Sequence, residues 1–252
     1  MTLRRFYAPT PAFASDQKSV VLDWSETAHL RDVLRLHCGD EVLIFDGAGH
    51  EFHCVIGTIN KNSSELTILS EVEAARPESP LELSLAVALL KHEKFDLVVQ
   101  KATELGVNRI IPVTSERADV RPRSDDQAAR RVSRWQRIAL EAAKQSGRAL
   151  VPEISPPVEM ATLVRTDGSS LPRIMFAERG GQSFKRVCEG FSGSPLSLLT
   201  LVGPEGGWDD FEIEMAREAG WSIVTLGGRI MRAETAAIAI VVLLEHRFGD
   251  LA

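Results

Sequence analysis

The sequence predicts an α/β protein in which a small β-rich domain precedes a larger domain built on a parallel sheet. Residues 1–73 contain several short strand-like runs and one helix, whereas apolar runs alternate with helical segments from residue 81 onward. The run Leu83–Leu90 is apolar almost throughout, as expected of a strand buried on both faces of a sheet. We therefore expect two domains, 1–73 and 81–252, joined by a linker that contains Pro77 and Pro80.

Composition excludes several classes of protein. The 252 residues are 44% hydrophobic and 25% charged, which is typical of a globular chain. No apolar run is long enough to span a bilayer, and the first residues lack the apolar centre of a signal peptide. Three cysteines without a CxxC pair fit a reduced compartment, so we expect a cytoplasmic protein with no membrane segment.

The first domain is expected to form a small barrel. Its strands are expected at 20–22, 41–45, 51–59 and 66–69, with a hairpin turn over 46–49. A helix over about 26–36, with Ser25 as its N-cap, should pack among them. His50, His53 and Cys54 suggest a metal site, but His50 and His53 point to opposite faces of a strand, so we expect no metal.

The second domain shows clear starts and stops. Helices over about 94–105 and 126–146 should end at Gly106 and Gly147, and Asp209 with Glu212 should form a capping box for a helix that Gly220 closes. A final helix is expected over 235–248. The remaining strands are expected at 109–113, 173–177, 196–202 and 223–226.

Two glycine-bearing turns follow strands of this sheet. The first is Gly203–Gly207, with the sequence GPEGG, and the second begins at Gly227–Gly228. Turns at the ends of neighbouring parallel strands would form a ligand-binding crevice, although a tight connection without a ligand is the alternative. Neither turn is a Walker A loop or a GxGxxG motif, which argues against nucleotide hydrolysis and hydride transfer.

The second turn also carries charges. Arg229, Arg232 and Glu234 stand between a strand and an apolar helix, in a place that we expect to be mostly buried. They could form a salt-bridged loop, or an arginine could orient a substrate while Thr235 caps the helix. We favour the second interpretation.

A basic segment over 116–148 contains nine Lys or Arg residues against five acids. Arg130, Arg134 and Arg137 are spaced to form one stripe of a helix, opposite an apolar stripe that includes Trp135. Such a stripe can be a solvated face, but an arginine-rich loop precedes it, which favours binding of nucleic-acid phosphates. The candidate RNA-binding residues are Arg4, Arg5, Arg31, Arg35, Arg121, Arg123, Arg130 and Arg134.

Six segments in order resemble one family. They are RRFYA (4–8), HLRDVLRLHCGD (29–40), QKATELGV (100–107), EAAKQSGR (141–148), LVGPEGGW (201–208) and LGGRIMRAETAA (226–237). Together they closely resemble the RsmE family, the 16S ribosomal RNA uridine N3-methyltransferases of the SPOUT superfamily. The resemblance implies a PUA-like N-terminal domain that binds RNA, and a SPOUT domain whose deep trefoil knot holds S-adenosylmethionine. It also implies a homodimer that acts on the small ribosomal subunit during ribosome biogenesis.

The resemblance implies where the cofactor lies, in three loops that follow strands. Met231 stands where the family usually has leucine, a nearly volume-conserving change. The residues implied to contact the cofactor are Ala177, Val202, Gly203, Pro204, Gly206, Gly207, Leu226, Gly227, Ile230 and Met231.

The implied reaction assigns chemistry to two residues. Uridine N3 lies on the pairing edge, so the target must be unpaired, and its proton has to leave. Arg232 would stabilise the resulting anion, and Glu205 would accept the proton or orient the arginine. A purely structural role of Glu205 in its turn is equally compatible with the sequence. Two alternative functions are a SPOUT enzyme acting on another nucleotide or a ribose 2′-OH, and a non-catalytic RNA-binding assembly factor.

Overall fold

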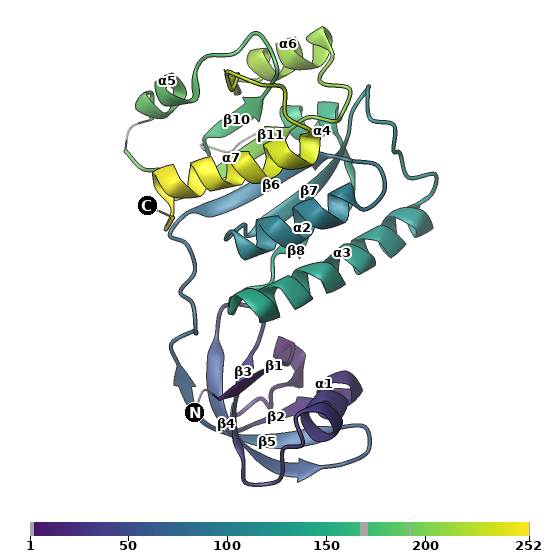
Figure 1. The fold of residues 1–252 in the computed structure, drawn as a ribbon, viewed down its shortest axis with the longest axis vertical. Helices are drawn as coiled ribbons and strands as arrows, with labels where there is room; N and C mark the ends of the chain where they lie inside the picture. Colours follow the sequence, from purple (N-terminus) through teal and green to yellow (C-terminus); the bar gives the residue numbers. More distant parts are fainter. Residues whose placement is uncertain (1–2, 167–170, 192, 252) are drawn as a thin grey trace. The chain divides into compact units, whose positions relative to one another are not determined.

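A computed structural model describes residues 3–251 apart from 167–170 and 192. The chain forms two compact units (Figure 1). The first comprises residues 1–78 together with Leu140–Val151, and the second comprises Ser79–Ala139 and Pro152–Ala252. Residues 140–151 therefore belong to the first unit, although the sequence places them with the second domain. Two ion pairs hold this segment to the rest of the first unit. Lys144 pairs with Glu26, and the Arg148 guanidinium pairs with Glu78 at 2.7 Å.

The first unit is a five-stranded sheet, which confirms the β-rich domain. Among its described strands only the pair β1–β3 is parallel, and the remaining neighbours are antiparallel. The Asp46 carboxylate accepts hydrogen bonds from the backbone N–H groups of Ala48 and His50, which closes the β3–β4 hairpin as predicted. The strands, in spatial order, are β1 (Arg4–Tyr7), β3 (Glu41–Phe45), β4 (Glu51–Ile59), β5 (Ser64–Val72) and β2 (Ser19–Leu22).

The helical segment of this unit differs from the expectation. The α-helix α1 (Trp24–Ala28) is short and continues as one turn of π-helix, η2 (His29–Val33). Asp23, not Ser25, is the N-cap, because its carboxylate accepts the backbone N–H of Glu26 at 2.9 Å. A short 3₁₀-helix, η1 (Thr10–Ala12), completes the unit.

The second unit contains a parallel sheet, as predicted, with the order β12-β10-β11-β6-β7-β8 and with β9 also pairing with β7. The residues of β6 are buried on both faces from Leu85 to Ala88, which accounts for the continuous apolar run. The strands are β6 (Glu82–Ala88), β7 (Arg109–Thr114), β8 (Glu153–Ile154), β9 (Val158–Glu159), β10 (Arg173–Phe176), β11 (Ser197–Val202) and β12 (Ser222–Val224).

Helices cover both faces of this sheet. Helices α4 and α6 pack on one face, where Met160, Ile213 and Trp221 join a cluster with Leu201 and Met175 of the strands. Figure 1 shows α2 and α7 lying together across the opposite face. The helices are α2 (Lys94–Glu104), α3 (Asp125–Ser146), α4 (Met160–Arg165), α5 (Phe184–Glu189), α6 (Asp210–Glu218) and α7 (Ala233–Phe248).

Several predicted helix ends are confirmed and one is wrong. The Asp209–Glu212 capping box is present, and Gly106, Gly147 and Gly220 have positive φ at the helix ends. Helix α7, however, begins at Ala233 with Arg232 at its N-cap and no side-chain cap, so Thr235 does not cap it. The sequence did not predict β1, β8, β9, α4 or α5. No helix among the described residues has the length and apolar character needed to cross a membrane.

Candidate active site

The two glycine turns do not follow neighbouring strands, which corrects the expectation from the sequence. Strand β10 lies between β11 and β12, with Phe176 opposite both Val202 and Val224. The ends of three parallel strands therefore meet at one edge of the sheet, and Ala177 and Val202 lie there, both buried. A site at this edge is built by three loops, and the loop after β10 is in the middle.

The Gly203–Gly207 turn is held from below by Trp208. Its indole is fully buried, and Nε1 donates to the Phe176 carbonyl at 2.9 Å. A Cβ on residue 203 would lie 2.8 Å from this Nε1, so only glycine fits above the ring. Packing against Trp208 therefore requires glycine at position 203. Trp208 lies within the LVGPEGGW segment, but the sequence alone gave no role for it.

The loop after β10 is tied directly to this turn. The Glu178 carboxylate accepts the backbone N–H of Trp208 at 3.2 Å and lies against Gly207, whose φ is +69°. Arg179 donates to the Trp208 carbonyl at 2.9 Å and to Asp210. Sequence reasoning missed both residues, because their partners lie about thirty positions away and no local pattern marks them.

The same loop also encloses the end of β12. Ala177 N–H donates to the Val224 carbonyl on one edge of this strand, whereas Gln182 N–H donates to the Ile223 carbonyl, which faces the other edge. Thr225 N–H returns a bond to the Gln182 carbonyl at 3.0 Å. A Cβ on Gly181 would lie 2.6 Å from the Thr225 nitrogen, so two backbones touch here. β12 is thus held between β10 and the loop that leaves β10.

Residues Gly227–Arg232 of the third loop are exposed, which contradicts the predicted burial of Arg229 and Arg232, whereas the predicted burial of Glu234 is confirmed. Arg229 and Arg232 are exposed, Ile230 is 100% exposed and Met231 is 37% exposed. A Cβ on Gly227 or Gly228 would meet no atom within 4 Å. The backbone of this loop is therefore open to a ligand or a second chain.

The two motif carboxylates share one ammonium group. Lys94 Nζ lies 3.0 Å from Glu205 Oε1 and 3.9 Å from Glu234 Oε2, and Lys91 N–H also donates to Glu205. Partial burial raises the pKa of Glu205, but the hydrogen bonds from Lys94 and from backbone N–H groups outweigh it and keep the pKa below its usual range. Glu205 is therefore an ionised, paired carboxylate near neutral pH.

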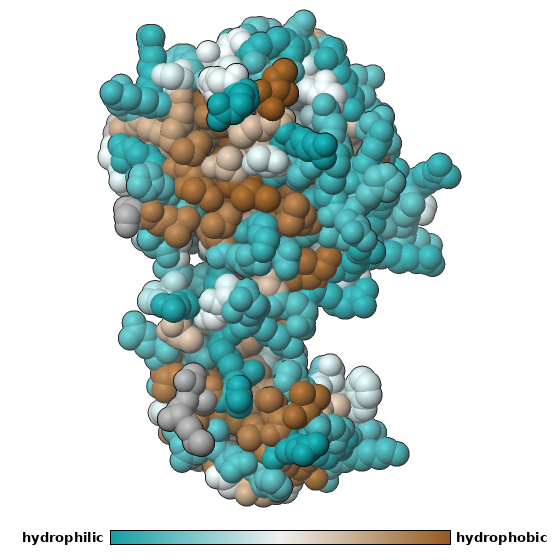
Figure 2. Space-filling model, viewed as in Figure 1, coloured by the Kyte–Doolittle hydropathy of each residue, from teal (hydrophilic) through white to brown (hydrophobic). Residues whose placement is uncertain are grey.

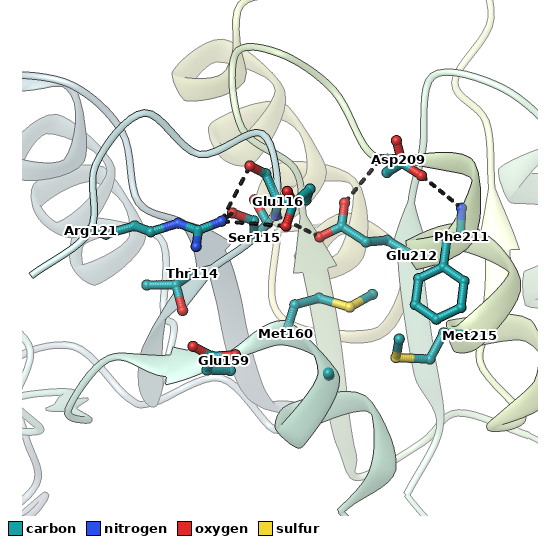
Figure 3. Close-up of a pocket in the computed structure, with 11 residues that line it drawn as sticks. Thr114, Ser115, Glu116, Arg121, Glu159, Met160, Asp209, Phe211, Glu212 and Met215 are labelled. Atoms are coloured by element: carbon teal, nitrogen blue, oxygen red, sulfur yellow. Dashed lines mark hydrogen bonds and ion pairs between the residues drawn. The ribbon is translucent and has the colours of Figure 1, made fainter.

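A cavity of about 240 Å³ lies beside the start of α6 and is also lined by residues of α4 (Figure 3). Glu212 joins its two halves, because its carboxylate accepts the backbone N–H groups of Glu116 and Asp209, each at 2.9 Å. Arg121 crosses its rim to the carbonyls of Ser115 and Glu116. Glu116 pairs with Arg121, Glu212 is bonded to backbone N–H groups, and Asp209 pairs with Arg117, so most charged groups around this cavity already have partners.

The candidate RNA-binding arginines fall into two groups. Arg5 has a structural role, because its side chain is 13% exposed, pairs with buried Glu51 and lies over the Phe45 ring. Arg31 bonds Asp32 and backbone carbonyls, Arg121 bonds carbonyls as above, and Arg134 pairs with Asp96 of α2. The exposed candidates for which no such side-chain bond is described are Arg4, Arg35, Arg123 and Arg130.

The structure shows the predicted stripe on α3. Arg130, Arg134 and Arg137 are exposed, whereas Trp135 and Ala139 on the other stripe are buried. Among the described residues no group of His, Cys, Asp or Glu is arranged to hold a metal ion. His50 and His53 instead pair with Glu71 and Glu41, respectively.

Comparison with known proteins agrees with this arrangement. The sequence model of an RNA methyltransferase domain matches residues 77–245, and that of an RNA methyltransferase PUA domain matches residues 22–69. Ribosomal RNA small subunit methyltransferase E of Buchnera aphidicola subsp. Schizaphis graminum is 30% identical over 95% of both chains. The Synechocystis protein of that name is 31% identical over 87% of this chain and 70% of its own.

Solved structures give the same result. The crystal structure of ribosomal RNA small subunit methyltransferase E from Neisseria gonorrhoeae, bound to S-adenosylmethionine, has a TM-score of 0.86 at 33% identity and covers 100% of both chains. A putative methyltransferase from Legionella pneumophila, also in complex with this cofactor, has a TM-score of 0.85 at 31% identity over 100% of both chains. With its PUA and SPOUT methyltransferase units, the chain belongs to the ribosomal RNA small subunit methyltransferase E family.

Proposed function

We propose that this protein transfers a methyl group from S-adenosylmethionine to N3 of a uridine in the 16S ribosomal RNA of the small subunit. The observation that carries the proposal is the meeting of three loops at the ends of β10, β11 and β12, two of which hold the family motifs. The Buchnera, Synechocystis and Neisseria proteins are small-subunit ribosomal RNA methyltransferases, and the Neisseria protein binds this cofactor.

The residues present fit the cofactor. The open space beside Gly227 and Gly228 leaves the backbone of the Leu226–Arg232 loop free to contact a ligand. Buried Glu234 has one carboxylate oxygen, Oε2, without a hydrogen-bond donor among the described residues. The residues proposed to hold the cofactor are Ala177, Val202, Gly203, Pro204, Gly206, Gly207, Leu226, Gly227, Ile230 and Met231.

The proposed site includes a deep trefoil knot. Knots are rare in proteins, so the proposal needs a physical basis. The basis is that β12 has hydrogen-bonded partners on both edges, β10 on one side and residues 181–182 on the other. The chain beyond β12 continues into α7, which packs on α2 and β11. A trefoil requires in addition that this chain end pass through the loop, which we propose that it does.

The chemistry places different demands on the two charged candidates. When bound, S-adenosylmethionine supplies a methyl group already activated on a sulfonium centre. Arg232 is exposed at the N-cap of α7, where its guanidinium is available to the developing anion of a uridine. Glu205 is paired with Lys94 and has a lowered pKa, which makes it a weak base. We therefore favour an orienting role for Glu205 over proton acceptance.

The proposed RNA contacts are electrostatic. Arg123, Arg130 and Arg137 are exposed on and before α3, and Arg4 and Arg35 are exposed on the first unit. Phosphate contacts of this kind give binding that weakens steeply with salt. The net charge of −6 confines RNA to such local basic surfaces.

We also propose a cytoplasmic homodimer. Figure 2 shows hydrophobic side chains gathered along α7, and the exposed apolar residues there and in the preceding loop are Val242, Ile230 and Met231. Ile230 is fully exposed within the proposed cofactor-binding loop, and an exposed apolar patch of this kind marks an interaction surface that a second chain would cover. A dimer formed through this surface would place each site beside the partner. The substrate, ribosomal RNA, makes the cytoplasm the proposed compartment.

The test replaces Arg232 with alanine. We expect methylation of small ribosomal subunits that lack the modification to fall about 100-fold while calorimetry shows unchanged cofactor binding. Arg186→Ala, an exposed arginine on α5, serves as the control and should keep full activity. Near-full turnover by Arg232→Ala would refute its role. Mass spectrometry of the modified nucleoside distinguishes uridine N3 from a ribose 2′-OH, and absence of cofactor binding would favour a non-catalytic assembly factor.

A further inference from the structure

Lys94 occupies an unusual position for a lysine. It is the first residue of α2, and the positive end of a helix dipole disfavours a cation there. Its ammonium group compensates by lying between two carboxylates, Glu205 at 3.0 Å and Glu234 at 3.9 Å. At this position Lys94 therefore stabilises the two carboxylates and not its own helix.

The two partners come from the two motif segments. Glu205 is the centre of the Gly203–Gly207 turn after β11, and Glu234 is in the first turn of α7, directly after the Leu226–Arg232 loop. The described residues provide no hydrogen-bond donor to Glu234 Oε2, and Lys94 is its ion-pair partner at 3.9 Å. One side chain from a third element thus connects two loops that border the proposed cofactor site.

We propose that Lys94 is a positioning residue for methyl transfer, which fixes the Gly203–Gly207 turn against the start of α7 and orients Glu205. The inference rests on the proposed function, since it names a further residue of the same site. Without the ammonium group, Glu205 and Glu234 would be two neighbouring carboxylates with no cation between them. The turn and the helix start would then separate, and both the cofactor pocket and the position of Arg232 at the N-cap would change.

The charged groups around Glu205 set its pKa, so the proposed role of Lys94 can be tested by the pH dependence of activity. Lys91 and Lys94 face it from the segment that begins α2, and Glu234 faces it through Lys94. Arg117 packs against Gly206, while Lys91 is itself paired with Asp119. Removing Lys94 takes away the hydrogen bond that lowers the pKa of Glu205, so that carboxyl should become protonated at higher pH.

The experiment compares three variants of the full-length protein by calorimetry with S-adenosylmethionine and by methylation of small subunits across pH. We expect Lys94→Met to weaken cofactor binding about tenfold and to move the acid limb of the kcat profile to higher pH. Lys94→Arg keeps the charge and should restore most of both. Lys185→Met is the control, because Lys185 pairs with Glu189 on the surface of α5, outside the motif loops.

A second comparison separates positioning from folding. In a Glu205→Gln background, Lys94→Met should leave the acid limb where it is, because the group that Lys94 controls no longer titrates. Wild-type binding and an unmoved acid limb in Lys94→Met would overturn the inference while leaving the proposed function intact. A wild-type protein that neither binds the cofactor nor methylates RNA would overturn both.

Discussion

Replacing Gly181 with alanine tests the contact that encloses β12. The added Cβ would lie 2.6 Å from the Thr225 nitrogen, 2.7 Å from the Val224 carbonyl carbon and 2.8 Å from the Ile223 oxygen. All three are backbone atoms, two of β12 and one of the residue that follows it, and β12 is also bonded to β10, so no side chain can rotate away. The loop and the strand must separate.

The cost follows from the interactions that this separation would break. Three hydrogen bonds join the segments: Gly181 N–H to Thr225 Oγ1, Thr225 N–H to the Gln182 carbonyl, and Gln182 N–H to the Ile223 carbonyl. At a net contribution of about 1 kcal/mol each, their partial loss together with the overpacking strain gives about 3–5 kcal/mol. For a domain of this size that lowers the melting temperature by roughly 10 °C.

Equilibrium denaturation in urea, followed by tryptophan fluorescence, measures the change. Gly227→Ala is the matched control, because a Cβ there meets no atom within 4 Å, and its stability should stay within about 0.5 kcal/mol of wild type. If Gly181→Ala unfolds at the same urea concentration as the control, the two backbones do not touch as described and the reasoning is refuted.

Three further outcomes are expected. Trp208→Phe should lower the free energy of unfolding by about 2 kcal/mol, because the buried Phe176 carbonyl loses its donor, and an unchanged denaturation midpoint would contradict this. The backbone N–H of Phe211 and the Arg117 guanidinium lower the pKa of Asp209, so its contribution to stability is present above the unfolded-state pKa of about 4 and is lost as pH falls below it. Asp209→Ala should therefore flatten the acid side of the stability–pH curve, and an equally steep curve would exclude the linkage. An alkylating reagent at pH 8 should modify only the exposed Cys38 in the native protein, because burial raises the pKa of Cys54 to about 12 and also raises the pKa of Cys188. Mass spectrometry should show all three cysteines modified after unfolding.

Local signals predicted most of the elements. Strands β3 and β4 have the predicted bounds, because alternation and a turn act over a few neighbouring residues. The Asp209–Glu212 capping box was predictable for the same reason, since both partners lie within one helical turn. Where two candidates competed locally, the prediction could fail, as when Asp23 and not Ser25 capped α1.

Tertiary features were not accessible in this way. The place of β10 between β11 and β12 depends on how distant strands pair, and no pattern within either motif encodes it. Glu178 acts on a turn thirty residues away, and Lys94 connects segments that follow different strands. The exposure of Arg229 and Arg232 was mispredicted because a flanking apolar helix suggested burial that this loop does not have. The roles of the cofactor-binding and catalytic residues stay predictions.

The two-sided bonding of β12 constrains the order in which the protein can fold. The loop over 177–182 precedes β12 and α7 in the chain, so during synthesis it exists before the strand that it must enclose. The three loops at this edge therefore assemble only after β12 has been made. We expect a chain truncated before β12 to have no affinity for the methyl donor, so that competence for methylation depends on this strand.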